Sequence, residues 1–483
     1  MRRHAGAHPR MGATDVCPLV PVAGIAMEET AEFARALGER VGRELGIPVY
    51  LYETAQPDSA RSSLSAIRAG EYEGFFDKIR RPEWKPDFGP AEFDARRGAT
   101  VIGARDFLIA CNVNLNTTST RRANAVAFDV REAGRTQLDA DWNPIRDPAG
   151  NPVIVPGSLK AVKAIGWFIE EYGIAQVSMN LTNIRITPLH VAFDEVCRRA
   201  DARGLRVTGS ELVGLIPLQC LLDAGRYFLE KQQRSTGVSE RELLKIAVRS
   251  LGLDELAPFN PEERVIEYLL HDASESRLVG LTLSAFADET ASESPAPGGG
   301  SVAAYVGALG AALGAMVANV SSHKRGWDAR WQEFSEWAER GQQHKEALLR
   351  LVDEDTRAFG RVMEAFGLPK GTDEEKALRK TAIQEATKSA TKVPFRVMEE
   401  AVASMAVMRA MAETGLRSSA SDAGVGAMCA RTAVVGAFLN VRTNAAQLTD
   451  REFAEDLLTR GAAIEQRAQA LETEILEIVV ARF

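Results

Sequence analysis

Histidine is scarce in this chain, and two of its six histidines stand within the first eight residues. His4 and His8 belong to the run HAGAHPRMG, in which Gly6 and Pro9 disfavour a helix. Because His8 precedes a proline, its backbone is restricted to extended geometry and its ring is presented from a loop. An imidazole titrates near neutral pH, so His8 beside Arg10 is suited to proton transfer. The alternative is a frayed terminus in which these histidines have no role.

Asp355 lies on an otherwise apolar stripe. The stripe follows helical spacing, in steps of three or four residues: Leu348, Val352, Asp355, Phe359, Val362 and Phe366. A carboxylate on the core side of a helix requires a raised pKa, a partner or both. A raised pKa suits general acid–base chemistry, whereas the structural alternative is an aspartate paired with a neighbouring Arg or Lys. Asp353 and Glu354 fall off the stripe and are expected to be solvated.

A glycine run, Pro297-Gly298-Gly299-Gly300-Ser301, directly precedes a long apolar segment. Backbone N–H groups of consecutive glycines at a helix N-terminus can hold a carboxylate or a phosphate. No Walker lysine follows, so a nucleotide P-loop is not indicated. The alternative is a flexible linker with Ser301 as the helix N-cap.

Two further patterns allow a flat ring to bind. In the loop Asp87–Phe93, Phe88 and Phe93 can stack on a heterocycle, or can fill the protein's own core. Asn440 and Asn444 stand one helical turn apart and can bond either a ligand or a neighbouring helix.

Composition excludes several classes of protein. A net charge of −8 and a pI near 5.6 argue against a nucleic-acid partner. Five cysteines without a CxxC pair indicate neither a disulfide framework nor a zinc knuckle, and no metal is expected. The N-terminal run lacks the apolar stretch of a signal peptide, so a reducing cytoplasm is expected.

Up to about residue 275 the pattern is that of an α/β protein. Strands are predicted at Thr100–Ala104 and at Phe107–Leu115. In the second strand one face holds Asn112 and Asn114, and the other holds Phe107, Ile109, Cys111, Val113 and Leu115. A third strand is predicted at Gln176–Thr187 with a bulge near Thr182–Asn183. A helix is predicted at Ser158–Tyr172, with Ser158 as N-cap and Gly173 after its end.

Beyond this point no strand pattern remains, and an all-helical bundle is expected. Its predicted helices cover residues 278–287, 301–320, 327–366, 372–413, 421–448 and 451–483. Thr372 and Glu375 form a capping box, and Pro394 is expected to kink the helix that follows. The uncharged stretch Ser301–Val320 has a transmembrane length, but its glycine and alanine content favours a soluble helix buried on all sides, so no membrane partner is expected.

Several long motifs resemble the glutamate formiminotransferase family. They are His8–Gly12, Asp15–Pro18, Val49–Tyr52, Ala66–Glu73, Asp87–Pro90, Gly98–Thr100, Gly103–Arg105 and Gly209–Leu215. Ala296–Ala304 and Val352–Asp355 are similar to the cyclodeaminase family. The order of the motifs resembles the fused bifunctional enzymes of histidine breakdown, and the resemblance covers essentially the whole chain.

The resemblance implies an activity and its residues. A formimino group would pass from N-formimino-L-glutamate to tetrahydrofolate, polyglutamylated or not, and ring closure would then give 5,10-methenyltetrahydrofolate and ammonia. His8 would be the transferase catalytic residue and Asp355 that of the cyclodeaminase. The folate-binding segment would consist of Gly89, Pro90, Ala91, Glu92, Phe93, Asp94, Ala95, Arg96, Arg97 and Gly98.

The resemblance also implies an architecture and a homo-oligomer. Two ferredoxin-like α+β subdomains would cover residues 1–106 and 107–271, followed by a linker at 272–280 and a helical domain at 281–483. Family members carry a leading strand–helix–strand block, with an acidic residue assisting the histidine, before the motif that begins at His8. Because Met1 falls inside this first subdomain, we expect it to be truncated, through a misassigned start codon. The alternative is a monofunctional cyclodeaminase behind a non-catalytic folate-binding or assembly module.

Overall fold

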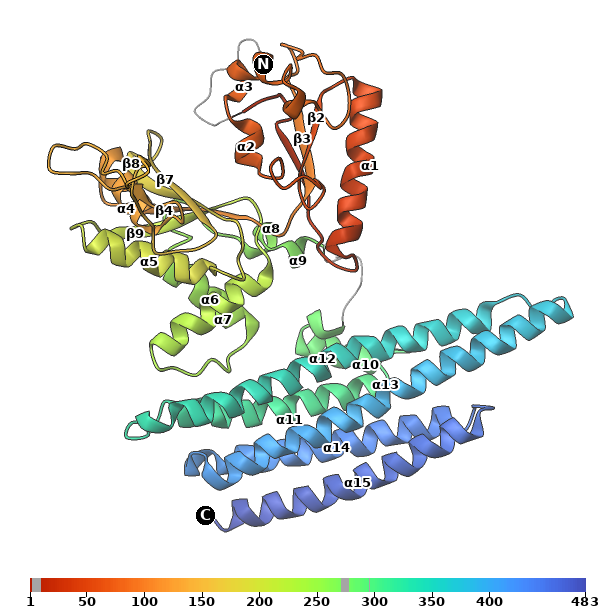
Figure 1. Cartoon of the computed structure of the whole chain (residues 1–483). Coiled ribbons are helices and arrows are strands. Elements are labelled where there is room, and N and C mark those ends of the chain that lie inside the picture. The colour runs from red at the N-terminus through yellow and green to blue at the C-terminus, as the bar shows by residue number, and fades with distance from the viewer. Residues whose placement is uncertain (2–9, 271–277, 295) are drawn as a thin grey trace. The chain divides into compact units, whose positions relative to one another are not determined.

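The computed structural model describes residues 1, 10–270, 278–294 and 296–483 and divides into two compact units, Met1–Gly214 and Leu215–Phe483. The first unit holds all the strands, and the described residues of the second unit form helices and loops (Figure 1). This confirms the predicted α/β part followed by a helical part.

The first sheet is parallel, and each of its faces is covered by helices. Its elements are β1 (Val16–Leu19), β3 (Thr100–Ala104) and β2 (Val49–Glu53), in that spatial order, with α1 (Met27–Leu45), α2 (Leu64–Arg68) and α3 (Glu71–Lys78). Val49 and Leu51 share a buried cluster with residues of α1, whereas Tyr50 and Tyr52 share one with residues of α2 and α3. This division follows from the alternation of side chains along a strand.

The second sheet is antiparallel. Its strands are β7 (Val162–Ile169), β8 (Ile174–Leu181), β4 (Ile109–Leu115) and β9 (Val207–Val213), in that spatial order, and they pack with α4 (Thr120–Val130) and α5 (Leu189–Asp201). In β4, Cys111, Val113 and Leu115 are fully buried, as their predicted common face requires. A small hairpin of β5 (Arg135–Thr136) and β6 (Ile154–Val155) follows α4.

The helix predicted at Ser158–Tyr172 is wrong, because this segment contains strand β7. Val162, Ala164 and Gly166 alternate with more exposed residues, which is the period of a strand. Gly173 has a φ of 65° and forms the tight turn into β8, so the same left-handed glycine serves a hairpin instead of a helix end. Ser158 caps no helix, since its hydroxyl donates to the carbonyl of Asp129 (3.2 Å).

The predicted strand at Gln176–Thr187 is also too long. β8 ends at Leu181, and no bulge is required at Thr182–Asn183. The Asn183 side chain instead accepts hydrogen bonds from the N–H groups of Arg185 (3.0 Å) and Ile186 (3.3 Å), which closes a turn.

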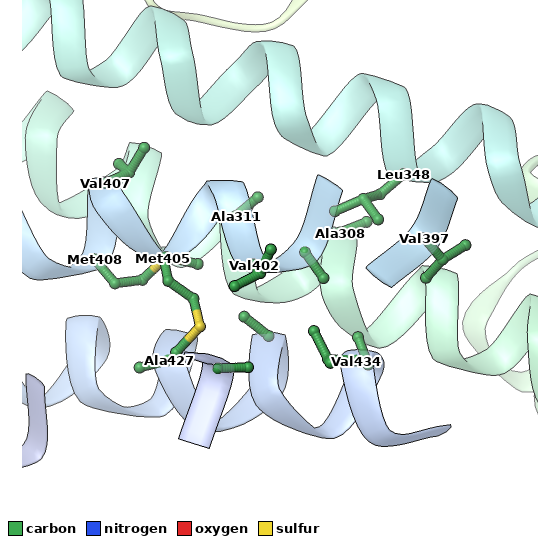
Figure 2. Packing of buried hydrophobic residues seen from close by; sticks show 14 of the residues in the cluster. Ala308, Ala311, Leu348, Val397, Val402, Met405, Val407, Met408, Ala427 and Val434 are labelled. Carbon is green, nitrogen blue, oxygen red and sulfur yellow. The ribbon is translucent and has the colours of Figure 1, made fainter. Parts of the chain in front are cut away.

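Long helices packed side by side build most of the second unit (Figure 1). They are α11 (Gly299–Ser322), α12 (Trp331–Gly367), α13 (Asp373–Thr414), α14 (Ala420–Ala445) and α15 (Arg451–Val480), preceded by α6 (Leu218–Lys231), α7 (Glu240–Leu251), α8 (Pro261–Arg264), α9 (Ile266–Leu269) and α10 (Leu283–Thr290). Thr372 and Glu375 form the predicted capping box of α13. The core is rich in small and flexible apolar side chains such as Ala311, Val402 and Met405 (Figure 2).

Glycine allows α11 and α14 to pack closely. A Cβ added at Gly310 would lie 2.7 Å from the Gly426 carbonyl oxygen, and one at Gly426 would lie 3.0 Å from the Gly310 carbonyl oxygen. Among the described residues, α11 and the segment Arg417–Ala445 are long and apolar enough to cross a membrane by length and composition. The packing of both within the helical unit accounts for the same composition.

The loop between α6 and α7 docks onto α11 and α12. We call Ser235–Gly237 the clamp. The Thr236 N–H donates to Ser335 Oγ (2.9 Å), and the Gly237 carbonyl accepts from Asn319 Nδ2 (2.8 Å). A Cβ on Gly237 would lie 2.3 Å from the Ala338 Cβ, so only glycine permits this approach.

Candidate functional site

Asp355, on α12, lies against the first turn of α11. Ser301 Oγ donates a hydrogen bond to Asp355 Oδ2 (2.9 Å) and lies 3.3 Å from Thr356 Oγ1. Ser301 is fully buried and Asp355 is partly buried. Two features that are distant in the sequence, the glycine run and the acidic position on the stripe, therefore form one site.

Glycine is required for this contact. A Cβ on Gly300 would lie 2.4 Å from Asp355 Oδ1 and 2.6 Å from Oδ2. A Cβ on Gly299 would lie 3.3 Å from Nδ2 of Asn440, which brings α14 to the same place. The run thus lets a carboxyl group and a carboxamide approach the start of α11.

Burial raises the pKa of the Asp355 carboxyl above its ordinary value, and the hydrogen bonds from the side chain and backbone of Ser301 act in the opposite direction. No Arg or Lys side chain of the described residues lies within ion-pair distance of Asp355, so the predicted structural alternative, an ion-paired aspartate, is wrong. α11 begins at Gly299 and its N-cap residue, Gly298, has no capping side chain, so its N-terminus adds a positive dipole end. An acid held in this way can exchange protons with a bound substrate.

Two expectations for residues near Asp355 are corrected. Ser301 is not the N-cap of α11, because Gly298 takes that position and Ser301 lies in the first turn. Asp353 is not solvated, since it is 9% exposed and accepts a hydrogen bond from the Leu278 N–H (2.8 Å). Glu354 lies at the surface of α12 and pairs with Arg396 (2.6 Å).

The third correction concerns the stripe beyond Asp355. Leu348 and Val352 are buried, but Phe359 is 40% and Phe366 is 45% exposed. At 37 and 42 residues, α12 and α13 are longer than their neighbours, and their connected ends project beyond the rest of the bundle (Figure 1). The helical spacing correctly placed Leu348 and Val352 on the buried face of α12. Beyond Asp355 this face is exposed, because α11, which packs against α12, begins beside Asp355.

Asn440 and Asn444 have different roles. Asn440 lies beside Gly299, and its Nδ2 donates to the Gly436 carbonyl (3.0 Å). Asn444 Nδ2 donates to the Ala390 carbonyl (3.0 Å) and joins α14 to α13. Only Asn440 belongs to the Asp355 site.

In the first unit, His8 lies outside the described residues, and the chain that follows it pairs with the end of the predicted folate segment. The Ala99 N–H donates to the Met11 carbonyl (3.1 Å), and the Ala13 N–H donates to the Arg97 carbonyl (2.8 Å). A Cβ on Gly12 would lie 1.9 Å from the Ala99 carbonyl oxygen, which explains this glycine. Arg10 pairs with Glu73 (2.8 Å).

The predicted folate segment has a buried and an exposed part. The ring of Phe93 packs against those of Tyr72, Phe75 and Phe76 at centroid distances of 5.3, 5.5 and 4.6 Å, and Phe88 packs on the other core cluster. Both rings therefore pack in the protein's own core and are not available to stack on a bound heterocycle. Gly89 to Glu92, Arg96 and Arg97 are exposed and remain able to meet a ligand.

The second sheet carries a cluster of hydrogen-bonded polar side chains that the sequence did not predict as one group. Gln176 Nε2 donates to Asn114 Oδ1 (2.8 Å), and Asn112 Nδ2 donates to Glu211 Oε2 (3.1 Å). The alternation of Asn112 and Asn114 in the sequence signalled a polar face, but their partners come from two other strands. Across the described residues, no group of three His, Cys, Asp or Glu side chains is arranged to hold a metal.

The fold defines a two-part chain, in which an α/β part precedes a helical part that holds the Asp355 carboxyl group against the start of α11. Family models match both parts: a formiminotransferase N-terminal subdomain at residues 1–105, a formiminotransferase domain at 110–271 and a formiminotransferase-cyclodeaminase model at 282–463. The chain is 43% identical to a formimidoyltransferase-cyclodeaminase of Gallus gallus over 99% of this chain and 86% of that protein. The chain belongs to the formimidoyltransferase-cyclodeaminase family.

Two further similarities concern the second half. A methenyltetrahydrofolate cyclohydrolase of Methylorubrum extorquens is 40% identical over 41% of this chain and 95% of that protein. A crystal structure of formiminotetrahydrofolate cyclodeaminase from Thermotoga maritima covers 42% of this chain and 97% of that chain, at 27% identity and a TM-score of 0.38.

Proposed function

We propose that this chain transfers the formimino group of N-formimino-L-glutamate to N5 of tetrahydrofolate and then closes the product to 5,10-methenyltetrahydrofolate with release of ammonia. Family membership over both halves supports this pair of reactions, as part of histidine degradation, with tetrahydrofolate as co-substrate. The observation that carries the second step is the Asp355 carboxyl group at the start of α11.

In the ring closure, N10 of the folate attacks the carbon of the protonated formimino group. Asp355 takes the proton from N10 and delivers it to the amino group, whose bond to carbon then breaks to release ammonia. The proton lost by N10 is the one gained by the leaving group, so the step balances without a further reactant. A carboxyl group with a raised pKa is suited to both transfers.

Ser301 and Gly300 position this carboxyl group. The Ser301 hydroxyl holds Oδ2, while the missing side chain of Gly300 leaves room for both oxygens. Asn440 Nδ2, close to Gly299, is placed to bond a polar edge of the bound ring.

In the transfer step, His8 accepts the proton of N5 as N5 attacks the formimino carbon, and then protonates the departing glutamate amine. The resemblance of His8–Gly12 to the family motif supports this role. The exposed residues of Gly89–Gly98 would contact the folate, and the end of this segment is joined to the chain after His8 by the hydrogen bond from Ala99 to Met11. The catalytic assignments of His8 and Asp355 are both part of this proposal.

Finer structural features are also proposed. The strand order β7-β8-β4-β9, with α4 connecting β4 to β7 and α5 connecting β8 to β9, agrees with a ferredoxin-like subdomain between residues 107 and 214. We expect a cytoplasmic homo-oligomer, and the exposed Phe359 and Phe366 are consistent with a further covered surface.

A two-step assay tests the function. Purified full-length protein is given N-formimino-L-glutamate and tetrahydrofolate, and ammonia release and methenyltetrahydrofolate absorbance are followed separately. Asp355→Asn should lower ammonia release by about 10²- to 10⁴-fold and let 5-formiminotetrahydrofolate accumulate, whereas His8→Ala should abolish transfer and leave closure of supplied 5-formiminotetrahydrofolate intact. Unchanged ammonia release by a folded Asp355→Asn protein contradicts the mechanism. Closure without any transfer by the unmodified chain favours the monofunctional alternative.

The cyclohydrolase similarity supports a second candidate for the helical part, the addition of water to methenyltetrahydrofolate. Both reactions act at the carbon that bridges N5 and N10 and need a proton moved beside it: hydrolysis adds water to this carbon, breaks one of its two bonds to nitrogen, protonates that nitrogen and releases one proton. Asp355 could serve either reaction. Supplying methenyltetrahydrofolate alone distinguishes them. Its loss at a rate matching ammonia release in the first assay would support the hydrolytic activity.

A further inference from the structure

A cavity of about 900 Å³ lies in the first unit between the outer face of α4 and the β5–β6 hairpin. Its apolar wall consists of Ala125, Phe128, Leu138, Trp142 and Leu205. Its cationic wall consists of Arg121, Arg122, Arg131, Arg135 and Arg203. Neither proposed reaction uses any of these residues, and the volume suits a ligand of ordinary cofactor size.

Two of the five arginines share one carboxylate, and the other three have no carboxylate partner. Asp129 accepts from Arg135 (3.0 Å) and from Arg203 (2.7 Å). Among the described residues, no carboxylate lies within ion-pair distance of Arg121, Arg122 or Arg131. In a chain of net charge −8, this is a local concentration of uncompensated positive charge.

Arg131 is held in place against an aromatic ring. Its guanidinium lies 4.1 Å from the centroid of Phe128, and its Nε donates to the Gly134 carbonyl (2.8 Å). Burial lowers its pKa, which shows that the surroundings disfavour the bare cation. A bound anion would remove this penalty.

Trp142 forms the rim of the cavity on the hairpin. Its side chain is 77% exposed, and its φ of 67° is a left-handed conformation that is strained for a side chain of this size. The turn is fixed by hydrogen bonds from the N–H groups of Trp142 to the Asp139 carbonyl (3.1 Å) and of Asn143 to Asp139 Oδ1 (2.9 Å). An exposed indole on a hydrogen-bonded turn, beside guanidinium groups without a carboxylate partner, is suited to stacking on a flat ring.

We propose that this cavity binds a nucleotide, with its base against Phe128 and Trp142 and its phosphates against Arg121, Arg122 and Arg131. Guanidinium groups match phosphate oxygens with paired hydrogen bonds. The three guanidinium groups without a carboxylate partner can meet the roughly three negative charges of a nucleoside diphosphate, whereas a dicarboxylate carries only two. The site does not depend on the proposed function.

Fluorescent N-methylanthraniloyl-ADP tests the proposal on the full chain. Energy transfer from tryptophan should saturate with a Kd of about 10–100 µM, and Trp142→Ala should remove most of the signal. Arg121→Gln, at an exposed residue without structural contacts, should weaken binding about tenfold, as should Arg131→Gln. Arg146→Gln, on the same hairpin but outside the cavity, is the matched control and should bind normally.

Competition identifies which part of the ligand matters. ADP should displace the probe well, and adenosine or inorganic tripolyphosphate alone should displace it at least tenfold less well. Absence of saturable binding up to about 1 mM, or equal binding by Arg121→Gln and Arg146→Gln, overturns the proposal. Displacement by tripolyphosphate as effective as by ADP would refute the role of the aromatic wall, and stronger displacement by poly(U) would point to RNA instead of a small ligand.

Discussion

The two units of this protein hold their candidate sites in different ways. In the helical unit, Asp355 and Ser301 project from the packed interior of long helices, and one missing Cβ at Gly300 sets their separation. In the α/β unit, the chain after His8 and the segment Gly89–Gly98 are loops beside the ends of parallel strands, joined mainly by backbone hydrogen bonds. A site between helices depends on side-chain volume, whereas a site between loops depends on backbone approach, so the two should fail under different substitutions.

The largest effect is expected at Gly300. In Gly300→Ala the added Cβ would meet both carboxylate oxygens of Asp355, which must then turn away from Ser301. We expect ammonia release to fall by about 10²-fold or more, with formimino transfer unchanged. Gly360→Ala on α12 has no atom within 4 Å of its new Cβ, and it should keep activity and gain about 0.5–1 kcal/mol of stability. Full cyclodeaminase activity in Gly300→Ala would refute the volume argument.

Gly12→Ala should damage the other unit instead. Its Cβ would lie 1.9 Å from a backbone oxygen of Ala99, and neither segment can shift without breaking hydrogen bonds. We expect the first unit to lose about 3 kcal/mol or more and transfer to be lost, while closure of supplied 5-formiminotetrahydrofolate continues. Hydrogen exchange resolved by peptide measures the two units separately. Gly74→Ala in α3, with open space around its Cβ, is the control. Equal loss of protection in both units would show that they do not behave independently.

Gly237→Ala tests the clamp. The new Cβ would lie 2.3 Å from the Ala338 Cβ and 2.4 Å from the Glu339 nitrogen, so the loop must withdraw from α12. The expected loss is about 2 kcal/mol, seen as a lower Tm and faster exchange at residues 235–237. Gly280→Ala, which has no neighbour within 4 Å, should change neither quantity.

The smallest effect concerns the stability cost of the acid itself. Burial raises the pKa of folded Asp355 above its unfolded value, so its contribution to stability is present at low pH and is lost as the pH rises through the folded pKa. Asp355→Asn should therefore raise the stability of the helical unit at pH 7 by about 1 kcal/mol, seen as an increase in Tm of roughly 2–4 °C. The increase should vanish as the pH falls below the pKa of an unfolded aspartate. A Tm gain that is independent of pH would assign the effect to packing.

Local periodicity predicted those parts of the molecule that are set within a single element. The long helices α11 to α15, the capping box at Thr372 and the acidic position of Asp355 all follow from spacing along one helix. The buried face of β4 follows in the same way from alternation.

Features that depend on contacts distant in sequence were not predictable from spacing. Ser301 and Asp355 meet only because α11 packs on α12, and the exposure of Phe366 depends on where neighbouring helices end. The error at Ser158–Tyr172 has a local cause, since Ser158 and Gly173 are the residues expected at the two ends of a helix. Two contacts with distant segments select the strand. β7 pairs with β8, and it packs against α4, where Gly166 approaches Asn124 too closely for a side chain.

Because of the clamp, the boundary between the two compact units differs from the boundary between the family models. The formiminotransferase model extends to residue 271, yet the compact helical unit already begins at Leu215 and includes α6 and α7. A gene divided at residue 271 would separate α6, α7 and the clamp from α11 and α12, onto which the clamp docks. A division after Gly214 would keep the clamp with α11 and α12. Chimeras that exchange halves between relatives should therefore be divided at the boundary between the compact units and not at the limits of the family models.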